Sequence, residues 1–305
     1  MKKHTLLIAL FSIFLLAGCA KTQTTKTPTT RTVTTTAGKT KIPAHPKRVV
    51  ATVYTDQLLS LGVHVVGSTQ MDLANPWLSK AQTKGIKNLG NAMNQEAILK
   101  LKPDLIVTSN EADVKKLKAI APVLYIPYGS TGDVYQSLTK FGQLMNRQAQ
   151  AKKVTADLKQ TAKTETTKLK AAGIDPAATT VSFFDVQANK LYVDGSTWGR
   201  GGSAIVTAMG FQLTKAAQKV EAGTGYKQIS TEASPTYAGD WLFFSNTSGS
   251  KQSISDLNAN AVWQSLTAVK AKHVIELPFE KMYYYDPIAV KGQIKLVAKT
   301  MLSQQ

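Results

Sequence analysis

Cysteine is almost absent from this chain of 305 residues, which contains Cys19 and no other. An intramolecular disulfide is therefore excluded. Histidine is also rare, and His45, His64 and His273 stand far apart rather than at the spacing of metal ligands. A zinc or manganese site made of protein side chains is not indicated, because such sites need several converging histidines and carboxylates.

The short motifs of common enzyme classes are missing as well. The sequence has no Gly-x-Ser-x-Gly nucleophile elbow and no glycine-rich phosphate loop that ends in Gly-Lys-Ser or Gly-Lys-Thr. A protein that only binds a ligand needs neither motif. The sequence therefore indicates a binding protein rather than an enzyme, and it indicates no cofactor.

The N-terminus has the features of an export signal. A basic start, Met-Lys-Lys, leads into an apolar run over residues 6–16, and Leu-Ala-Gly precedes Cys19. A basic start, a short apolar core and small residues before the cleavage site are typical of secretory signals. We therefore predict a lipoprotein signal peptide over residues 1–18, with Cys19 lipidated and the mature protein anchored on the extracytoplasmic face of the cell membrane.

Acidic residues are scarce, since 19 Asp and Glu stand against 37 Lys and Arg and give a net charge of +18. Such an excess is often a sign of nucleic-acid binding. Export separates the protein from cellular nucleic acid, so we expect no such partner and interpret the charge as attraction to an anionic cell envelope. Residues 19–30, rich in Thr and Lys with almost nothing to bury, are predicted to form a flexible tether.

Short apolar runs alternate with helical segments through the rest of the chain. This alternation predicts an α/β fold with mostly parallel sheets and helices on both faces. The length fits two lobes, which we place at residues 31–146 and 174–305, and Thr/Val alternation around Gly38 indicates a small hairpin at the start of the first. Strands are expected at 48–53, 65–68, 105–108 and 123–126 in the first lobe, and at 180–185, 190–193, 241–245 and 273–277 in the second.

The middle of the chain interrupts this alternation. Residues 147–172 are dense in Ala, Lys, Gln and Leu and are followed by Gly173. Good helix formers closed by a glycine predict one long helix, which at 1.5 Å per residue would span roughly 35 Å. Because a set of strands and helices of similar size lies on each side, we predict that residues 147–173 form a helix connecting the two lobes.

This organisation, together with three stretches of sequence, resembles a known family. The stretches are "KIPAHPKRVVATVYTDQLLSLGVHVVG" at 41–67, "NLGNAMNQEAILKLKPDLIVTS" at 88–109, and "DGSTWGRGG" at 194–202. They are similar to the helix-hinged (class III) substrate-binding lipoproteins that serve ABC importers of ferric siderophores, haem and cobalamin. The resemblance implies a monomer that binds its ligand between two lobes and delivers it to the membrane subunits of an importer.

Within that family, "YVDGSTWGRGG" at 192–202 and "YYYDP" at 283–287 most resemble the binders of ferric hydroxamates of the ferrichrome and ferrioxamine type. The residues fit such a ligand. Arg200 offers a rigid fork of donors for paired oxygens, and Trp198 offers a flat apolar face. Their loop follows the strand ending at Val193, and ligands in α/β sheets lie beyond the carboxyl ends of strands, so we expect both side chains to face the cleft.

Other aromatic residues are weaker candidates for ligand contacts. Tyr54 and Tyr128 each follow an expected strand, and Tyr128 resembles a ligand-contacting tyrosine of the family. The adjacent Tyr283, Tyr284 and Tyr285 cannot all point one way, and Tyr283 stands where hydroxamate binders often carry Trp, a departure that leaves the particular ligand open. Trp77, on the loop "NPWLSK", is the last candidate, as a residue at the rim of the cleft.

Two glutamates are singled out by the resemblance alone. Glu96 and Glu232 match the positions, one per lobe, at which the family offers carboxylates to arginines of the importer. Each precedes an apolar strand, which places it on the helix entering that strand. Charge pairs at a docking rim orient a partner and speed the encounter.

Two other ligands remain open. Haem could be held by a single axial side chain such as a tyrosine. A catecholate siderophore would require several basic residues in the cleft, and Arg200, Lys84 and Lys87 could supply them. In each reading the iron is held by its own organic ligand or ring, and no set of protein side chains is expected to bind a bare metal ion.

Overall fold

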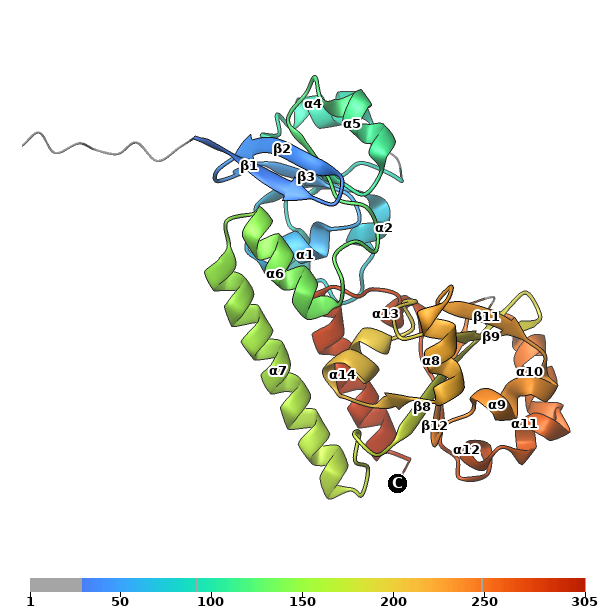
Figure 1. Ribbon diagram of the computed structural model, residues 1–305. Coiled ribbons are helices and arrows are strands. Elements are labelled where there is room, and N and C mark those ends of the chain that lie inside the picture. The colour runs from blue at the N-terminus through green and yellow to red at the C-terminus, as the bar shows by residue number, and fades with distance from the viewer. Residues whose placement is uncertain (1–28, 92, 248, 305) are drawn as a thin grey trace, which may run out of the picture.

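The computed structural model describes residues 29–304 except residues 92 and 248. The predicted signal peptide, Cys19 and most of the predicted tether lie outside the described residues. Within the described part of the chain, no helix combines the length and the apolar character needed to cross a bilayer. The chain folds into two lobes, each built around one sheet, with a long helix between them (Figure 1).

The N-terminal lobe contains a five-stranded parallel sheet in the order β5-β4-β3-β6-β7. Alternate residues of its strands point to opposite faces, so Val49 and Ala51 enter one apolar cluster while Val50 enters another. Both faces are therefore covered, as the apolar runs predict. The elements are β3 (Val49–Ala51), α1 (Thr55–Ser60), β4 (Val65–Ser68), α2 (Gln70–Leu73), α3 (Lys80–Thr83), β5 (Lys87–Asn88), α4 (Gln95–Lys100), β6 (Leu105–Thr108), α5 (Glu111–Leu117), β7 (Val123–Tyr125) and α6 (Val134–Leu144).

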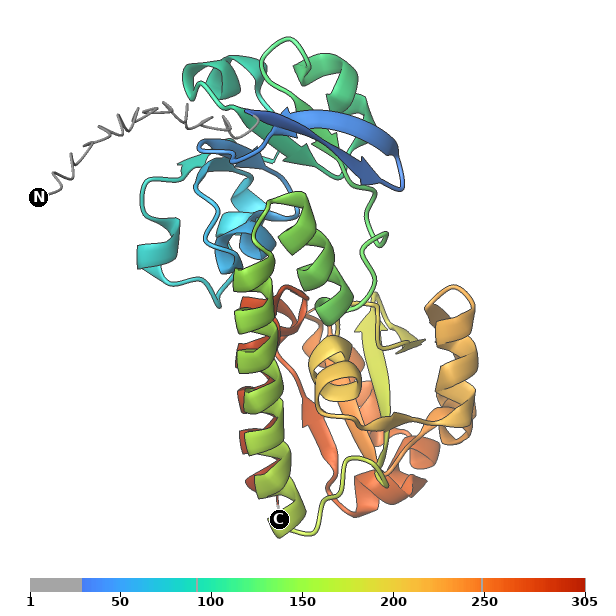
Figure 2. The same cartoon turned by 60° about the vertical axis from the view of Figure 1, so that its left-hand side comes forward.

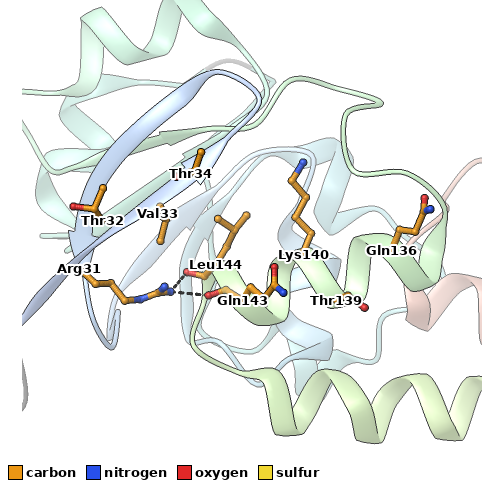
Figure 3. A pocket seen from close by; sticks show the side chains of 9 residues that line it. All are labelled: Arg31, Thr32, Val33, Thr34, Gln136, Thr139, Lys140, Gln143 and Leu144. Carbon is orange, nitrogen blue, oxygen red and sulfur yellow. Dashed lines mark hydrogen bonds between the residues drawn. The ribbon is translucent and has the colours of Figure 1, made fainter.

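The hairpin expected around Gly38 is present as β1 (Thr30–Thr35) and β2 (Gly38–Pro43). Arg31 joins it to the lobe, because its guanidinium donates to the backbone carbonyls of Gln143 and Leu144 at the end of α6 (Figure 3). The last carbonyls of a helix lack their usual partners four residues on, and that of Gln143 otherwise accepts only from backbone N–H groups of the turn that follows, such as Asn146 at 3.3 Å. A surface hollow of about 620 Å³ lies beside this contact, but its lining is mostly threonine and glutamine and includes no aromatic side chain.

The sheet of the C-terminal lobe is mixed and runs in the order β11-β9-β8-β12-β13, with β10 beside β8. Strands β10, β12 and β13 follow the parallel rule, whereas β9 returns antiparallel to β8. Only Ala188 and Asn189 join β8 to β9, both with positive φ, and a two-residue turn allows nothing but a hairpin. The strands are β8 (Thr180–Gln187), β9 (Lys190–Asp194), β10 (Gln212–Leu213), β11 (Tyr226–Ile229), β12 (Trp241–Asn246) and β13 (Val274–Glu276).

Helices surround this second sheet and close one continuous apolar core. The segment directly after the Trp-Arg-glycine stretch is a π-helix, a form that is rare and often found at functional sites. The helices are the π-helix η1 (Ser203–Ala208), α8 (Lys215–Ala222), the 3₁₀ turn η2 (Thr231–Ala233), α9 (Ser234–Tyr237), α10 (Lys251–Ala259), α11 (Ala261–Ser265), α12 (Thr267–Lys270), α13 (Phe279–Met282) and α14 (Pro287–Leu302).

The connecting helix is α7, Gln148–Ala171, which lies inside the range 147–173 expected from the sequence. It runs the length of the C-terminal lobe and packs along α14, as Figures 1 and 2 show from two sides. The N-terminal end of α14 also packs against α1 of the first lobe. The two lobes are therefore linked by two neighbouring helices, although the chain crosses directly between them only through α7.

Candidate functional site

A small cavity of about 70 Å³ lies where the two lobes meet. Its lining draws on both lobes. Side chains of α1, α2 and the segments after β3 and β7 lie on one side, and the tyrosine run, Tyr283–Tyr285, which precedes α14, lies on the other. Most of this surface is aromatic or apolar, with a few polar groups at its base. The lining residues are Val53, Tyr54, Asp56, Gln57, Met71, Asp72, Tyr128, Ser137, Tyr283, Tyr284, Tyr285 and Asp286.

The three consecutive tyrosines each take a different position. Tyr283 is 39 % exposed, Tyr284 donates its hydroxyl to the backbone carbonyl of Met71 at 3.0 Å, and Tyr285 meets Tyr128 edge-on at 5.8 Å between ring centroids. Burial raises the pKa of Tyr284 to about 12 and raises that of Tyr285 and Tyr128 as well. The phenols therefore stay neutral at physiological pH, and the hydroxyl of Tyr284 is already engaged by Met71.

Tyr128 and Tyr54 stand on the N-terminal side of the cavity but in different ways. Tyr128 is 64 % exposed, so its ring is available to a ligand. Tyr54 is buried, packs on Phe141, and donates its hydroxyl to the carbonyls of Ile126 and Pro127 at 3.0 and 3.1 Å. Tyr54 therefore shapes the wall of the cavity, and its hydroxyl is already engaged.

The loop that follows β9 lies against the tyrosine run. The backbone N–H of Gly201 donates to the carbonyl of Met282 at 3.2 Å, and a Cβ on Gly199 would come within 3.0 Å of the carbonyl of Tyr283. Gly199 also has a φ of 72°, which favours glycine. These contacts, rather than the carboxyl end of a parallel strand, bring the loop to the tyrosines. Strand β9 runs antiparallel to β8 in the otherwise mostly parallel sheet, so the rule for parallel strands does not explain the position of this loop.

Trp198 and Arg200 leave this loop in different environments. Trp198 is 42 % exposed and stacks on Tyr226 of β11 with ring centroids 4.6 Å apart. Arg200 is only 7 % exposed and lies over the ring of Phe279 at 4.8 Å. The tryptophan can therefore receive a ligand face directly, whereas the guanidinium is largely covered.

Arg200 belongs to a buried ion-pair cluster. Its Nε and Nη2 donate to Asp185 at 3.1 and 2.6 Å, and Asp194 lies 3.6 Å from Nε. Thr247, directly after the neighbouring parallel strand β12, donates its hydroxyl to Asp185. Nη2 also has a long bond, at 3.5 Å, to the hydroxyl of Thr247, whereas Nη1 has only long bonds, at 3.3 and 3.4 Å, to the carbonyls of residues 198 and 199. That edge of the fork is therefore the one most easily exchanged for other oxygens.

The second carboxyl of this cluster is poorly compensated. Burial raises the pKa of Asp194 to about 7, with Arg200 opposing the shift and Asp185 adding to it. Neither carboxyl oxygen of Asp194 has a hydrogen-bond partner among the described residues. One guanidinium thus faces two carboxyls, and the cluster holds its arginine in a fixed place near neutral pH.

A second group of carboxyls lies at the base of the cavity and joins the lobes. Asn75 donates its side-chain amide to Asp56 of α1 at 2.8 Å and to Asp286, the N-cap of α14, at 3.2 Å. Burial, and then the neighbouring Asp286, raises the pKa of Asp56 to about 9. Burial raises the pKa of Asp286 to about 6, opposed by the N–H groups of α14. Burial and the neighbouring carboxyl thus favour the protonated form of Asp56, whereas the N–H groups of α14 favour the ionised form of Asp286.

Trp77 does not line the cavity. Its indole N–H donates to the carbonyl of Lys281 at 2.7 Å, and its ring covers Gly292 of α14, where an added Cβ would lie 2.1 Å from the ring. Asn75 and Trp77 come from the same loop, so this loop fastens the start of α14 to the N-terminal lobe. The structure places Trp77 in the contact between the lobes, outside the lining of the cavity.

Glu96 and Glu232 are both exposed. Glu96 lies in the first turn of α4, ahead of β6, and Glu232 lies in the 3₁₀ turn η2, ahead of β12. Each therefore stands on a helical segment before a strand, as the sequence suggests. Among the described residues, neither takes part in an ion pair.

The sequence reasoning missed several residues of this region. Asp185 and Asp194 were not recognised as partners of Arg200, and Asn75 and Asp286 were not recognised as a link between lobes. The Asp-Pro pair at residues 286 and 287 was a usable signal, because Asp at the N-cap followed by Pro at the first helical position marks the start of a helix. Among the described residues no group of three or more His, Cys, Asp or Glu side chains is placed to hold a metal ion.

Comparison with known families decides the class of the protein. Residues 49–281 match the periplasmic binding protein family. The chain belongs to that family. Its members are binding proteins, which agrees with the absence of enzyme motifs in the sequence and with two lobes that meet at an aromatic cavity.

Relatives within the family share most of their length with this chain. The iron(3+)-hydroxamate-binding protein YxeB of Bacillus subtilis is 36 % identical over 274 residues, which is 88 % of this chain and 84 % of that protein. The FhuD protein from S. pseudintermedius has a TM-score of 0.76 at 28 % identity, over 90 % of this chain and 98 % of its own. FhuD2 from Staphylococcus aureus with bound ferrioxamine B has a TM-score of 0.71 at 27 % identity, over 85 % of this chain and 99 % of its own.

Proposed function

We propose that this periplasmic binding protein captures a ferric hydroxamate siderophore between its lobes and delivers the intact chelate to an ABC importer for iron uptake. The observation that carries the proposal is the aromatic cavity shared by both lobes, with Trp198 and Arg200 on a loop packed against its tyrosine run. The relatives named for iron(3+)-hydroxamate binding and the neighbour with ferrioxamine B support the choice of ligand.

The chemistry of the ligand fits these side chains. A ferric trishydroxamate presents paired oxygens around the iron and a flexible apolar backbone outside. In this proposal the exposed rings of Trp198, Tyr128 and Tyr283 pack on the backbone. The loosely held Nη1 edge of Arg200 exchanges its backbone carbonyls for ligand oxygens. The iron stays bound to the siderophore and takes no ligand from the protein.

Delivery involves surfaces outside the cavity. We propose that Glu96 and Glu232 pair with basic residues of the importer, one from each lobe, because both are exposed and occupy equivalent places before a strand. We also propose that the protein is a monomer on the extracytoplasmic face of the membrane, anchored by lipid on Cys19. Relatives named as lipoproteins support the anchor.

Isothermal titration calorimetry of the purified protein tests the choice of ligand. Ferrioxamine B, ferrichrome, a ferric tricatecholate and haem are titrated separately. The proposal predicts tight, saturable binding of the two hydroxamates and weak binding of the others. Tight binding of the tricatecholate or of haem alone would overturn the hydroxamate assignment in favour of that ligand.

Two tryptophan variants make the test specific to the site. Trp198→Ala removes an exposed ring beside the cavity and is expected to weaken hydroxamate binding by about tenfold or more. Trp77→Phe is the matched control, because Trp77 lies in the contact between the lobes and not in the cavity. Equal losses in the two variants would contradict the proposed site.

A further inference from the structure

A second cavity, of about 770 Å³, lies on the C-terminal lobe between α8, β11 and α9. Three lysines line it, Lys215 and Lys219 from α8 and Lys227 from β11, and the lining contains no carboxylate. In the described part of the chain none of the three forms an ion pair. The remaining lining residues are Thr214, Ala216, Val220, Gly223, Thr224, Tyr226, Thr236 and Tyr237.

The electrostatics of this cavity favour an anion. Lys215 lies in the first turn of α8, at the positive end of the helix dipole, where anions bind favourably. The ammonium group of Lys227 lies 5.8 Å from the centre of the Tyr237 ring. The cavity thus gathers three positive charges and a helix N-terminus, and no acidic side chain lines it.

Tyr226 connects this cavity with the proposed siderophore site. Its ring is 41 % exposed, lines the lysine cavity, and stacks on Trp198 at 4.6 Å. The indole of Trp198 also lies over Gly225, where an added Cβ would be 3.6 Å away. A Cβ on Gly199 of the same loop would lie 3.0 Å from the carbonyl of Tyr283, so Trp198 stands on a loop that packs on the tyrosine run while its ring stacks on Tyr226.

We propose that Tyr226 and the lysine cavity form a subsite that receives an acidic arm of the siderophore, so that the protein prefers ferric hydroxamates carrying a pendant carboxylate. This inference rests on the proposed function. The hydroxamate centre lies between the lobes, the aliphatic part of the arm crosses the stacked rings of Trp198 and Tyr226, and its carboxylate reaches Lys215, Lys219 and Lys227.

Three complexes that share one ferric centre test this preference. Ferrioxamine B ends in an amine and is cationic at that arm, its N-acetyl derivative is neutral there, and its N-succinyl derivative carries a carboxylate. We expect the succinyl complex to bind best and the amine worst, with about a tenfold difference in Kd at low salt, since each partly exposed charge pair contributes modestly and three act together. The difference should shrink as salt is added.

Two triple variants separate the subsite from the overall charge of the protein. Lys215→Gln, Lys219→Gln and Lys227→Gln together should bind the three complexes with equal affinity, at the level of the neutral complex. The matched control changes three exposed lysines of α7, Lys152, Lys153 and Lys163, to Gln. It removes the same charge and should retain the ranking of the unaltered protein.

The outcomes distinguish this inference from the proposed function. If none of the three complexes binds, the proposed function fails. If all three bind the unaltered protein tightly with one affinity, the proposed function stands and the acidic-arm subsite is overturned. The subsite is equally overturned if the ranking survives in the variant lacking the three cavity lysines.

Discussion

Replacement of Asp56 by Asn should stabilise the protein, and by an amount that grows with pH. Asp56 is 4 % exposed, its Oδ2 accepts from Asn75, and its Oδ1 has no partner among the described residues. Burial and Asp286 raise its pKa to about 9 from an ordinary value of 3.8. Asn has the shape of the protonated acid and never ionises, so it fills the same place without binding a proton.

The magnitude follows from the proton that the folded state holds. Between the unfolded pKa and the folded pKa of Asp56, folding requires uptake of one proton, and the free energy of unfolding falls by about 1.4 kcal/mol per pH unit. From pH 5.5 to pH 8.5, three units inside this window, the loss is about 4 kcal/mol. Asp56→Asn removes this loss, because the variant binds no proton at that position.

Urea denaturation of both proteins at intervals from pH 5.5 to 8.5 measures the effect. The difference in unfolding free energy between Asp56→Asn and the unaltered protein should widen steadily with pH. Asp256→Asn, at an exposed position of α10, is the matched control and should give a small difference that is constant with pH. If the unfolding free energies of Asp56→Asn and the unaltered protein instead differ by the same amount at every pH, Asp56 is ionised in the folded protein and the reasoning is refuted.

Three further predictions concern the ion pair, the link between lobes and the docking surface. Arg200→Ala should weaken hydroxamate binding by at least tenfold and destabilise the fold by about 3–5 kcal/mol at pH 8. Its stability deficit in urea should shrink at pH 5, because burial raises the pKa of Asp194 to about 7 and this carboxyl is then protonated and needs no cation; an equal deficit at both pH values would argue against the ion pair. Gly292→Ala should lower the unfolding free energy by about 1–3 kcal/mol, because the new Cβ meets the ring of Trp77, and an unchanged value would show that this contact is loose. Glu96→Ala and Glu232→Ala should leave hydroxamate affinity unchanged in calorimetry yet slow cellular uptake of the iron complex, and normal uptake by the double variant would refute the docking role.

Much of the fold could be predicted from local pattern. The strands of the N-terminal lobe read as short apolar runs because both of their faces are buried, as in Leu105–Thr108. The connecting helix was predicted almost to the residue, since its composition is uniform and Gly173, with a φ of 84°, follows its end. Patterns of this kind depend on neighbours in the sequence and are visible without any knowledge of the fold.

The direction of β9 could not be predicted in the same way. The turn before it consists of Ala188 and Asn189 at φ of 45° and 64°. Asn tolerates this conformation, but Ala does so rarely, and the turn contains no glycine. The prediction of mostly parallel sheets therefore gave no direction for this strand. The loop with Trp198 nevertheless reaches the tyrosines, because its own glycines allow it to pack on Met282 and Tyr283.

The electrostatics of the site depend on contacts between residues far apart in the sequence. Arg200 meets Asp185 only because the hairpin of β8 and β9 folds the chain back on itself, and Asn75 bonds to Asp286 across 211 positions. The sequence alone suggested an arginine with a free fork. The structure shows a guanidinium held by two carboxyls, with one edge loosely bonded.

The central claim is that a ferric hydroxamate binds between the lobes, against the tyrosine run and the loop of Trp198. Anomalous diffraction at the iron absorption edge, from crystals of the protein grown with ferrioxamine B, tests it most directly. The account predicts one strong iron peak between Tyr128, Tyr283 and Trp198, with no protein atom in the coordination shell of the iron. An iron peak elsewhere on the surface, or an iron bound by protein side chains, would contradict it.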